Sequence, residues 1–310
     1  MSDRDRNAGL VVVTGANGFV GSRVARRCSA AGRPVRAIVR TPGFPGLQHP
    51  GIEEIVGEFT NSEIAHAAVR GADAVVHCAA GIGPDLETAR RVNVEGTRAM
   101  VEAALEVPVR RYVQISTISV YAKSTAERLD EEAAIKNEGD PYGFTKADAD
   151  RVVLEAMLRG LPAAILRPGA ILGVHPTSTW GVKVPTRIRD RVMKLRGDGR
   201  EPMPWVHVEN LVDAVLLALE DDRAVGRVYN VADETHSWRE FTDEIRGWFG
   251  TAPLDTIPES EVVEQGGYSV SRFDAARLRD ELGYRPRRTY RDGMDEAAEH
   301  WAREGATHGS

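Results

Sequence analysis

The feature that most constrains this chain is a glycine-rich turn that directly follows an apolar run near the N-terminus. Residues 10–13 read Leu-Val-Val-Val, and the chain continues Thr14-Gly15-Ala16-Asn17-Gly18-Phe19-Val20-Gly21. A β-branched run ending in closely spaced glycines predicts a buried strand that turns sharply into a helix. Gly15 can take backbone angles closed to other residues, Gly18 leaves room for a phosphate, and Gly21 lets the helix pack closely on the strand. Because the first N–H groups of such a helix form an anion site, the segment predicts a place for the pyrophosphate of a dinucleotide, although glycine-rich turns without a ligand also occur.

Strand-like and helix-like segments alternate through the first half of the chain. The strands are expected at 10–13, 35–39, 52–56, 74–77, 111–116 and 163–166, and the helices at 22–31, 61–69, 86–105 and 142–159. This alternation predicts an α/β fold with a doubly wound parallel (Rossmann) sheet covered by helices on both faces.

The alternation breaks near Pro168. Residues 168–204 are rich in Pro, Gly, Thr and Arg, and a basic stretch at 187–195 reads as a helix. A short strand is expected at 205–208 and another at 228–231, with an amphipathic helix between them. Helical patterns predominate from residue 235 onward.

We therefore expect two parts, which suits a length of 310 residues. A dinucleotide-binding domain covers 8–167 and is rejoined by 205–234. A smaller, discontinuous C-terminal substrate lobe is built from 168–204 and 235–304. Ligands of such sheets bind at the carboxyl ends of the strands, where this lobe is expected to roof the crevice.

Composition excludes several classes of protein. The formal net charge of −6 argues against a nucleic-acid partner. No apolar run approaches the ~20 residues of a membrane span, and the charged N-terminus does not read as a signal peptide, so we expect a cytoplasmic protein without a membrane partner. Cys28 and Cys78 are the two cysteines and are expected to be small core residues rather than a disulfide framework. The eight histidines show no metal-ligand spacing, so no metal site is predicted.

A second informative segment is Tyr142-Gly143-Phe144-Thr145-Lys146, which follows the helix-start signal Asp140-Pro141. At this spacing Tyr142 and Lys146 share one helix face. An ammonium group beside a phenol stabilises the phenolate, so the pKa of Tyr142 is expected to fall from its usual value. Such a tyrosine exchanges a proton with an alcohol or carbonyl oxygen, whereas the alternative is a surface Tyr–Lys pair without chemistry.

Two hydroxyl groups, Ser116 and Thr117, stand at the end of the strand expected at 111–116. A parallel sheet keeps its ligands at this edge. A hydroxyl here is placed to hold a substrate oxygen against Tyr142. The alternative is that both hydroxyls satisfy nearby backbone groups.

Together these segments resemble the extended short-chain dehydrogenase/reductase family of the NAD(P)-dependent epimerase/dehydratase type. The resemblance rests on motifs that occur in order from about residue 10 to residue 290: Thr14-Gly15-x-x-Gly18-x-x-Gly21, His77-Cys78-Ala79-Ala80, Asn93-Val94-Glu95-Gly96-Thr97, Ser116-Thr117, Tyr142-x-x-x-Lys146, Leu166-Arg167-Pro168-Gly169, Val206-His207-Val208 and Leu282-Gly283-Tyr284-Arg285-Pro286. An ordered set of this kind is far more specific than any one motif.

The resemblance implies roles for individual residues. Tyr142 is implied as the catalytic acid/base, Lys146 as the group that holds the ribose hydroxyls and lowers the tyrosine pKa, and Thr117 as the substrate-binding hydroxyl. Asn93 is implied to shape its helix near the active site. The implied cofactor contacts are Gly15, Asn17, Gly18, Phe19, Val20, Gly21, Arg40, His77, Ala79, Ala80, Ser116, Tyr142, Lys146, Pro168 and Gly169. Within this set, residues 77–80 are implied to pass beside the ribose, and Pro168-Gly169 to flank the nicotinamide carboxamide.

The end of the second expected strand distinguishes the two nicotinamide cofactors. An acidic residue there grips the ribose 2′-hydroxyl of NAD, whereas an arginine accommodates the 2′-phosphate of NADP. The usual acidic position falls on Val39 and is followed by Arg40. Because a guanidinium matches a phosphate in charge and shape, we predict NADP(H) rather than NAD, with Arg40 as the main contact and Arg36 as a weaker candidate. The alternative is that both arginines are simply solvated.

The substrate is predicted from what the chain lacks. Relatives that act on nucleotide-sugars carry an asparagine and an arginine where this chain has Ala170 and Met203. The intervening segment offers apolar side chains, namely Trp180, Pro185, Met193, Pro202 and Met203. Against this stands a basic run at 187–200, which either contacts an anion or forms a solvated face.

The resemblance therefore favours an NADP(H)-dependent ketoreductase, similar to the dihydroflavonol reductase and 3β-hydroxysteroid dehydrogenase branch. The 4-pro-S hydride of NADPH is expected to reach a carbonyl carbon of a small, largely apolar substrate. A redox-neutral nucleotide-sugar epimerase or dehydratase with a retained cofactor is the alternative, although dehydratases often carry a Thr-Asp-Glu-type set that Ser116-Thr117-Ile118 lacks. A non-catalytic cofactor sensor is a third reading, which the presence of Tyr142 and Lys146 opposes. The family also implies a homodimer, formed through the helices of Asn93 and Tyr142.

Overall fold

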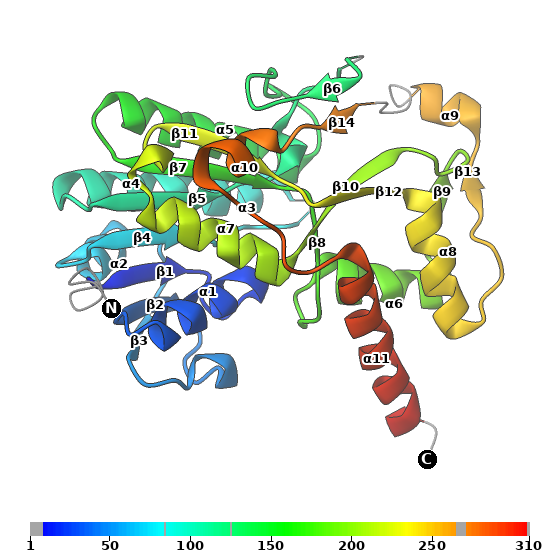
Figure 1. Cartoon of the computed structure of the whole chain (residues 1–310), viewed down its shortest axis with the longest axis horizontal. Helices are drawn as coiled ribbons and strands as arrows, with labels where there is room; N and C mark the ends of the chain where they lie inside the picture. The colour runs from blue at the N-terminus through cyan, green and yellow to red at the C-terminus, as the bar shows by residue number, and fades with distance from the viewer. Residues whose placement is uncertain (1–8, 84, 125, 265–270, 309–310) are drawn as a thin grey trace.

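The computed structural model describes residues 9–83, 85–124, 126–264 and 271–308. Its centre is a seven-stranded sheet in the order β11-β7-β5-β4-β1-β2-β3, in which every neighbouring pair is parallel (Figure 1). The strands are β1 (Val11–Thr14), β2 (Val35–Val39), β3 (Ile52–Val56), β4 (Ala74–His77), β5 (Arg111–Ile115), β7 (Ala163–Pro168) and β11 (Arg227–Val231). The predicted doubly wound parallel sheet is thus confirmed.

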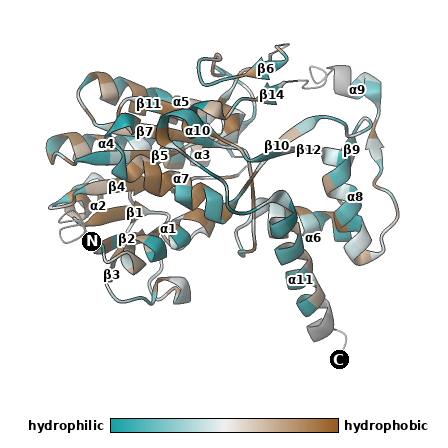
Figure 2. Cartoon of the chain, viewed as in Figure 1, coloured by the Kyte–Doolittle hydropathy of each residue, from teal (hydrophilic) through white to brown (hydrophobic). Residues whose placement is uncertain are grey.

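Helices cover both faces of this sheet. One face carries α1 (Phe19–Ala30), α7 (Val208–Glu220) and α10 (Ala276–Leu282), and the other carries α2 (Ser62–Val69), α4 (Gly96–Glu106) and α5 (Pro141–Leu158). Within β1, Val11 and Val13 pack in the first layer and Val12 in the second. Because both faces are covered, the central strands β1 and β4 are almost continuously apolar, whereas the edge strand β3 carries Glu53 and Glu54. Figure 2 shows brown, hydrophobic residues over much of the sheet between the helices.

The helical segment expected at 86–105 is interrupted. It consists of α3 (Leu86–Arg90), a π-helical turn η3 (Arg91–Glu95) and α4. A π-turn inserts one extra residue into the helix, and such turns are frequent at functional sites. The turn contains Asn93, one of the predicted site residues.

The smaller lobe surrounds a second sheet of β8 (Ala170–Leu172), β10 (Pro202–His207) and β12 (Glu234–Ser237). β10 runs parallel to β8 and antiparallel to β12. The strand expected at 205–208 therefore pairs with lobe strands, and not with the main sheet as the expectation for 205–234 required. By contrast, α7 and β11 from the same segment do pack with and pair in the main sheet.

Two short parallel pairs and several short turns and helices complete the fold. The remaining elements are β6 (Arg128–Leu129) with β14 (Arg272–Phe273), β9 (Leu195–Arg196) with β13 (Thr256–Ile257), the short turns η2 (Pro45–Leu47), η4 (Ile118–Val120), η5 (Thr179–Lys183) and η6 (Asp222–Ala224), and the helices α6 (Val184–Arg189), α8 (Trp238–Phe249), α9 (Glu259–Glu264) and α11 (Tyr290–His308). The helix expected at 187–195 was placed wrongly: α6 ends at Arg189, because Arg191 adopts a left-handed φ of 57° and the chain then enters β9.

The apolar side chains predicted to line a substrate pocket instead pack mainly on one another. Trp180 contacts Trp205 and Trp238 with ring centroids 5.4 and 5.2 Å apart, and Met193 and Met203 pack against the same cluster. These residues are therefore largely the core of the lobe. Among the described residues, no helix is long and apolar enough to cross a membrane.

Candidate active site

The glycine turn has the close backbone contacts that its sequence predicts. Gly15 has a φ of 61°, which favours glycine, and a Cβ there would lie 2.9 Å from the backbone of Ala79. A Cβ on Gly21 would lie 2.2 Å from the carbonyl oxygen of Gly15, and one on Gly18 would lie 3.1 Å from the same oxygen. Gly21 therefore allows the close approach of α1, while Gly15 allows the turn to pack on the loop after β4.

The start of α1 leaves backbone donors available. Gly18 is the N-cap residue, without a side chain to cap the helix, and the first turn contains no acidic residue. The N–H groups of Phe19 and Val20 occupy the first two helical positions, which have no acceptor within the helix. A helix end of this kind, with a backbone close to its surface, fits an anionic diphosphate.

A buried hydrogen-bonded chain joins the turn to the neighbouring strand and helix. The Ala79 N–H donates to Thr14 Oγ1 at 3.2 Å, and that hydroxyl lies 2.8 Å from His77 Nδ1. On the other side, Thr97 Oγ1 donates to the Asn93 carbonyl at 2.6 Å and lies 3.2 Å from His77 Nε2. Because each hydroxyl has one proton, this pattern assigns the imidazole proton to Nε2.

The His77 side chain is consequently structural. It is fully buried, and burial lowers its pKa to about 3, so the ring is neutral at ordinary pH. Both ring nitrogens bond within the protein, which leaves only the backbone of this segment for the predicted cofactor contact. Neither Thr14 nor Thr97 was among the predicted site residues, although Thr14 directly precedes the glycines.

Asn93 fixes the loop that follows β4. Its Oδ1 accepts from the Gly81 N–H at 2.7 Å, and its Nδ2 donates to the Gly81 carbonyl at 3.1 Å and to Thr145 Oγ1 at 2.9 Å. Thr145 lies on α5 between the two predicted catalytic residues. The π-turn thus aims one amide at both the β4 loop and the catalytic helix, which agrees with a shaping role for Asn93.

Tyr142 and Thr117 meet at the carboxyl edge of the sheet. Asp140 caps α5 by accepting the Gly143 N–H at 2.8 Å, which places Tyr142 in the first turn of the helix. The Thr117 hydroxyl lies beside the phenol, close enough to lower its pKa. Burial nevertheless raises the pKa of Tyr142 to about 12, with Asp140 and Asp150 adding to the effect and Thr117 opposing it. The predicted lowering of this pKa was therefore wrong for the chain itself, because desolvation exceeds the stabilisation of the phenolate.

Lys146 lies one turn further along α5. Its side chain is 1% exposed, and Nζ donates to the carbonyl oxygen of Ile115 at 2.8 Å. Burial lowers its pKa to about 8, while Asp150 and Cys78 oppose that fall. The ammonium thus lies at the carboxyl end of β5. The two predicted hydroxyl residues, Ser116 and Thr117, directly follow Ile115 in the sequence.

Ser116 directly follows β5 and is the remaining predicted site residue at the end of this strand. Its backbone N–H donates to the Leu166 carbonyl at 2.7 Å, but its buried Oγ has no hydrogen-bond partner among the described residues. A buried hydroxyl without a partner is costly, and a bound polar group would satisfy it. Pro168 ends the neighbouring β7, and the Gly169 N–H donates to the Val231 carbonyl at 3.0 Å.

The two arginines of β2 differ sharply. Arg40 follows the carboxyl end of β2 and is exposed, and its guanidinium has no hydrogen-bond or ion-pair partner among the described residues. Arg36 is near the start of the strand, where Nη1 donates to the carbonyls of Ala68 and Arg70 at 2.7 and 2.9 Å. Arg36 therefore caps the end of α2, and its weaker candidacy as a phosphate contact was wrong.

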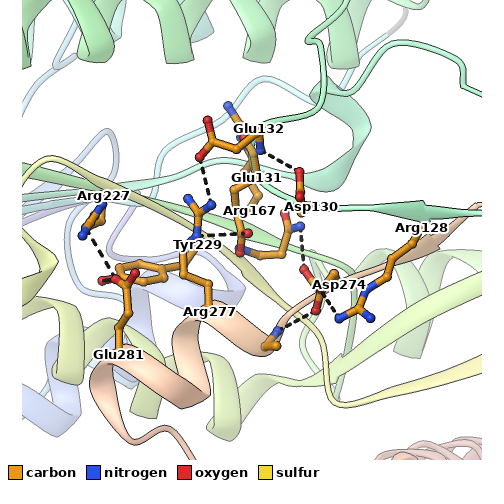
Figure 3. A network of polar contacts seen from close by, with 12 residues as sticks. Arg128, Asp130, Glu131, Glu132, Arg167, Arg227, Tyr229, Asp274, Arg277 and Glu281 are labelled. Carbon is orange, nitrogen blue, oxygen red and sulfur yellow. Dashed lines mark hydrogen bonds and ion pairs between the residues drawn. The ribbon is translucent and has the colours of Figure 1, made fainter. Parts of the chain in front are cut away.

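A polar network lies beside the site and connects it to the C-terminal segments (Figure 3). Arg167, at the end of β7, donates from Nε to Asp150 Oδ2 at 2.9 Å and from Nη1 to Tyr121 Oη at 3.0 Å. Glu131 accepts from the Asn230 N–H at 2.8 Å. In the same region, Arg277 and Asp274 of the C-terminal part pair with the loop around residues 128–132. Sequence reasoning quoted Arg167 only as part of a motif and missed Asp150 entirely.

Two cavities lie toward the lobe, and Tyr142 lines neither of them. One of about 450 Å³ is lined by residues 232–235, 272–275, Arg128 and Arg279. The other, of about 700 Å³, is lined by residues from 197–202 and 256–259 together with Arg272. Within the described residues, no group of three or more His, Cys, Asp or Glu side chains is placed to hold a metal ion.

Comparison with known families agrees with the geometry of this site. Residues 11–232, more than half of the chain, match the NAD dependent epimerase/dehydratase family. The chain therefore belongs to this family of NAD-dependent oxidoreductases, dehydratases and epimerases, as the resemblance of its motifs predicts.

Individual relatives cover nearly the whole chain. It is 28% identical over 305 residues to dTDP-glucose 4,6-dehydratase from Streptomyces antibioticus, covering 92% of this chain and 90% of that protein. It is 30% identical over 256 residues to 2-alkyl-3-oxoalkanoate reductase from Stenotrophomonas maltophilia, covering 79% and 77%. A solved structure, MoeE5 in complex with UDP-glucose and NAD, matches with a TM-score of 0.79 and 25% identity, covering 96% of this chain and 100% of that one. Because these names include both a dehydratase and a reductase, the choice of reaction depends on the site residues.

Proposed function

We propose that the protein is an NADP(H)-dependent reductase that converts a carbonyl group of a small substrate into a secondary alcohol. The observation that carries the proposal is the Tyr142 phenol, which lies beside Thr117 and keeps its proton at neutral pH because desolvation raises its pKa to about 12. A protonated phenol is the acid that carbonyl reduction requires. In the reverse direction the same group would act as the base.

The residues present fit a nicotinamide dinucleotide. The backbone donors of Phe19 and Val20 face the place for its diphosphate, and the unpartnered Ser116 Oγ offers a polar contact at the end of β5. When bound, this cofactor supplies hydride transfer to or from carbon. Thr117 orients the substrate oxygen, Tyr142 delivers a proton to it, and Lys146 holds the cofactor ribose.

The residues after Thr117 favour a reductase over a dehydratase. Ile118 and Ser119 follow Thr117 in the turn η4, so neither position supplies a carboxylate for elimination of water. The similarity to a named 2-alkyl-3-oxoalkanoate reductase points the same way. Ala170 and Met203, both packed in the lobe, replace the polar clamp expected of nucleotide-sugar enzymes.

Arg40 carries the proposed preference for NADP(H). It follows Val39 at the end of β2, where an acidic residue would instead favour NAD. Its exposed guanidinium is available to a 2′-phosphate.

The proposal is tested by following NADPH oxidation with a panel of ketones, 3-oxo esters and aldehydes. We expect stoichiometric oxidation that the variant Tyr142→Phe loses. Conversion of a nucleotide-sugar by protein with tightly bound cofactor, without net oxidation, would establish the epimerase or dehydratase alternative, which the dTDP-glucose 4,6-dehydratase relative supports. Cofactor binding by the wild type without turnover of any substrate, and equal binding by Tyr142→Phe, would establish a sensor.

The homodimer also stays a prediction. On α5, the apolar side chains of Val152, Val153 and Ala156 are buried within the chain in the layer of α2, α4 and α5. A dimer through this helix would therefore use other positions, such as Leu158, which is 91% exposed.

A further inference from the structure

Lys146 is buried beside a second ionisable residue of its own helix, Asp150. The two side chains are one turn apart, so they share a face of α5, and their exposed fractions are 1% and 0%. No carboxylate of the described residues lies within ion-pair distance of Lys146, whose Nζ instead donates to the Ile115 carbonyl. The interaction between Lys146 and Asp150 therefore acts through space, in surroundings where water screens it little.

One oxygen of the Asp150 carboxylate is hydrogen-bonded and the other is not. Its Oδ2 accepts from Arg167 Nε at 2.9 Å. Its Oδ1 is buried and has no hydrogen-bond partner in the part of the chain that the structure describes. Arg167 is itself anchored, because Nη1 also donates to Tyr121 Oη and to the Glu131 carbonyl at 3.0 and 3.3 Å.

Apart from Asp150 and the Arg167 cation that it binds, the ionisable groups that surround Lys146 are neutral near pH 7. From β4, His77 is uncharged because burial lowers its pKa to about 3, and the pKa of the Cys78 thiol is raised by burial to about 12. Tyr142, on the same helix as Lys146, keeps its proton as well. Among the described groups that act on Lys146, Asp150 thus supplies the negative charge.

We infer that Asp150 is a positioning residue that keeps Lys146 protonated in its buried place, with Arg167 holding the carboxylate in position. This inference rests on the proposed function for its catalytic meaning, because a protonated Lys146 is the form that holds the cofactor ribose. The effect of the Asp150 charge on the protonation of Lys146 does not depend on a bound cofactor or substrate.

The inference is tested by NMR titration of protein labelled with [13Cε]-lysine. The chain has five lysines, so the spectrum is simple, and Lys146→Met assigns the signal. In the wild type the signal is expected to titrate near pH 8. In Asp150→Asn the midpoint should fall by about one pH unit or more, since removing a nearby buried charge has effects of this order.

Asp148→Asn is the matched control. It removes a carboxylate from the same helix, but Asp148 pairs with Arg90 and Arg151 rather than facing Lys146. Its midpoint should equal that of the wild type. Asp150→Glu keeps the charge and should restore most of the wild-type midpoint.

Asp150→Asn leaves Arg167 as an uncompensated buried charge, which can prevent folding. The double variant Asp150→Asn/Arg167→Met removes both charges and avoids this penalty. Because the Arg167 cation is removed together with the Asp150 carboxylate, the midpoint should fall by less than in Asp150→Asn but should still fall. An unchanged midpoint in either folded variant would overturn the inference, and because no substrate or cofactor is present, that result leaves the reductase proposal untouched.

The same variants should also change cofactor binding. NADPH binding, followed by its fluorescence, should weaken for Asp150→Asn at a lower pH than for the wild type. A parallel, pH-independent loss in both Asp148→Asn and Asp150→Asn would indicate a general structural effect instead and would contradict the inferred role.

Discussion

Replacing Arg40 with alanine should change the choice between the two nicotinamide cofactors. The guanidinium is exposed and unpaired in the described structure, so its removal breaks no internal contact, and the whole effect should appear in binding of the 2′-phosphate. A hydrogen bond to a charged group is worth about 1.5–3 kcal/mol, and exposure places this one near the lower end. At 1.4 kcal/mol for each factor of ten, we expect the KM for NADPH to rise by about 10- to 30-fold.

The assay compares kcat/KM for NADPH and NADH in the wild type and in Arg40→Ala, with one ketone substrate at saturation. NADH lacks the 2′-phosphate, so its kinetics should change by less than about twofold. Arg36→Met is the matched control from the same strand. That change removes the cap on the Ala68 and Arg70 carbonyls and should lower stability by about 1 kcal/mol without altering the cofactor ratio. Equal losses for both cofactors in Arg40→Ala, or no loss for NADPH, would refute the reasoning.

Three other changes test the remaining parts of the site. Tyr142→Phe should lower kcat by about 100-fold or more while cofactor binding stays within about twofold, measured by turnover and fluorescence titration, and near-normal turnover would remove Tyr142 as the acid. Gly21→Ala places a Cβ 2.2 Å from a backbone carbonyl and should prevent folding or strongly lower Tm, whereas Gly18→Ala at 3.1 Å should fold and lose dinucleotide affinity; equal Tm values for the two would contradict this packing argument. Because the His77 pKa is lowered to about 3, the unfolded chain binds a proton below about pH 6.5 that the folded chain does not bind. The free energy of unfolding, measured with urea, should therefore decrease as the pH falls and should be lower by about 3 kcal/mol at pH 4.5. A His77→Asn variant with the same dependence on pH would show that His77 is not responsible.

The sequence predicted the sheet and the position of the site because both depend on local patterns. Alternating apolar strands and helices require a parallel sheet, and the glycines at 15, 18 and 21 are needed wherever a helix starts that close to a strand. The carboxyl ends of parallel strands meet at one edge, which is why Thr117 and Tyr142 could be expected to lie together.

Other features depend on contacts that are distant in sequence. β10 pairs with β8 and β12, although its apolar residues would equally suit the main sheet. Arg36 and Arg40 look alike in sequence, but only the first reaches the carbonyls at the end of α2. The π-turn at Asn93 likewise follows from the fit of one amide between Gly81 and Thr145, which no helical periodicity indicates.

The pKa of Tyr142 shows why spacing alone gave the wrong sign. An i, i+4 spacing ensures that Tyr142 and Lys146 are close, and closeness alone would favour the phenolate. In the folded chain Lys146 is directed to the Ile115 carbonyl and burial lowers its pKa to about 8, while the partly buried phenol loses much of its contact with water. Desolvation therefore dominates at both groups. It raises the pKa of Tyr142 and lowers the pKa of Lys146, and each shift favours the neutral form of the side chain. It follows that polar groups placed inside this site, such as Asp150 beside Lys146, control its protonation more strongly than charges on the protein surface do, because water screens the surface charges.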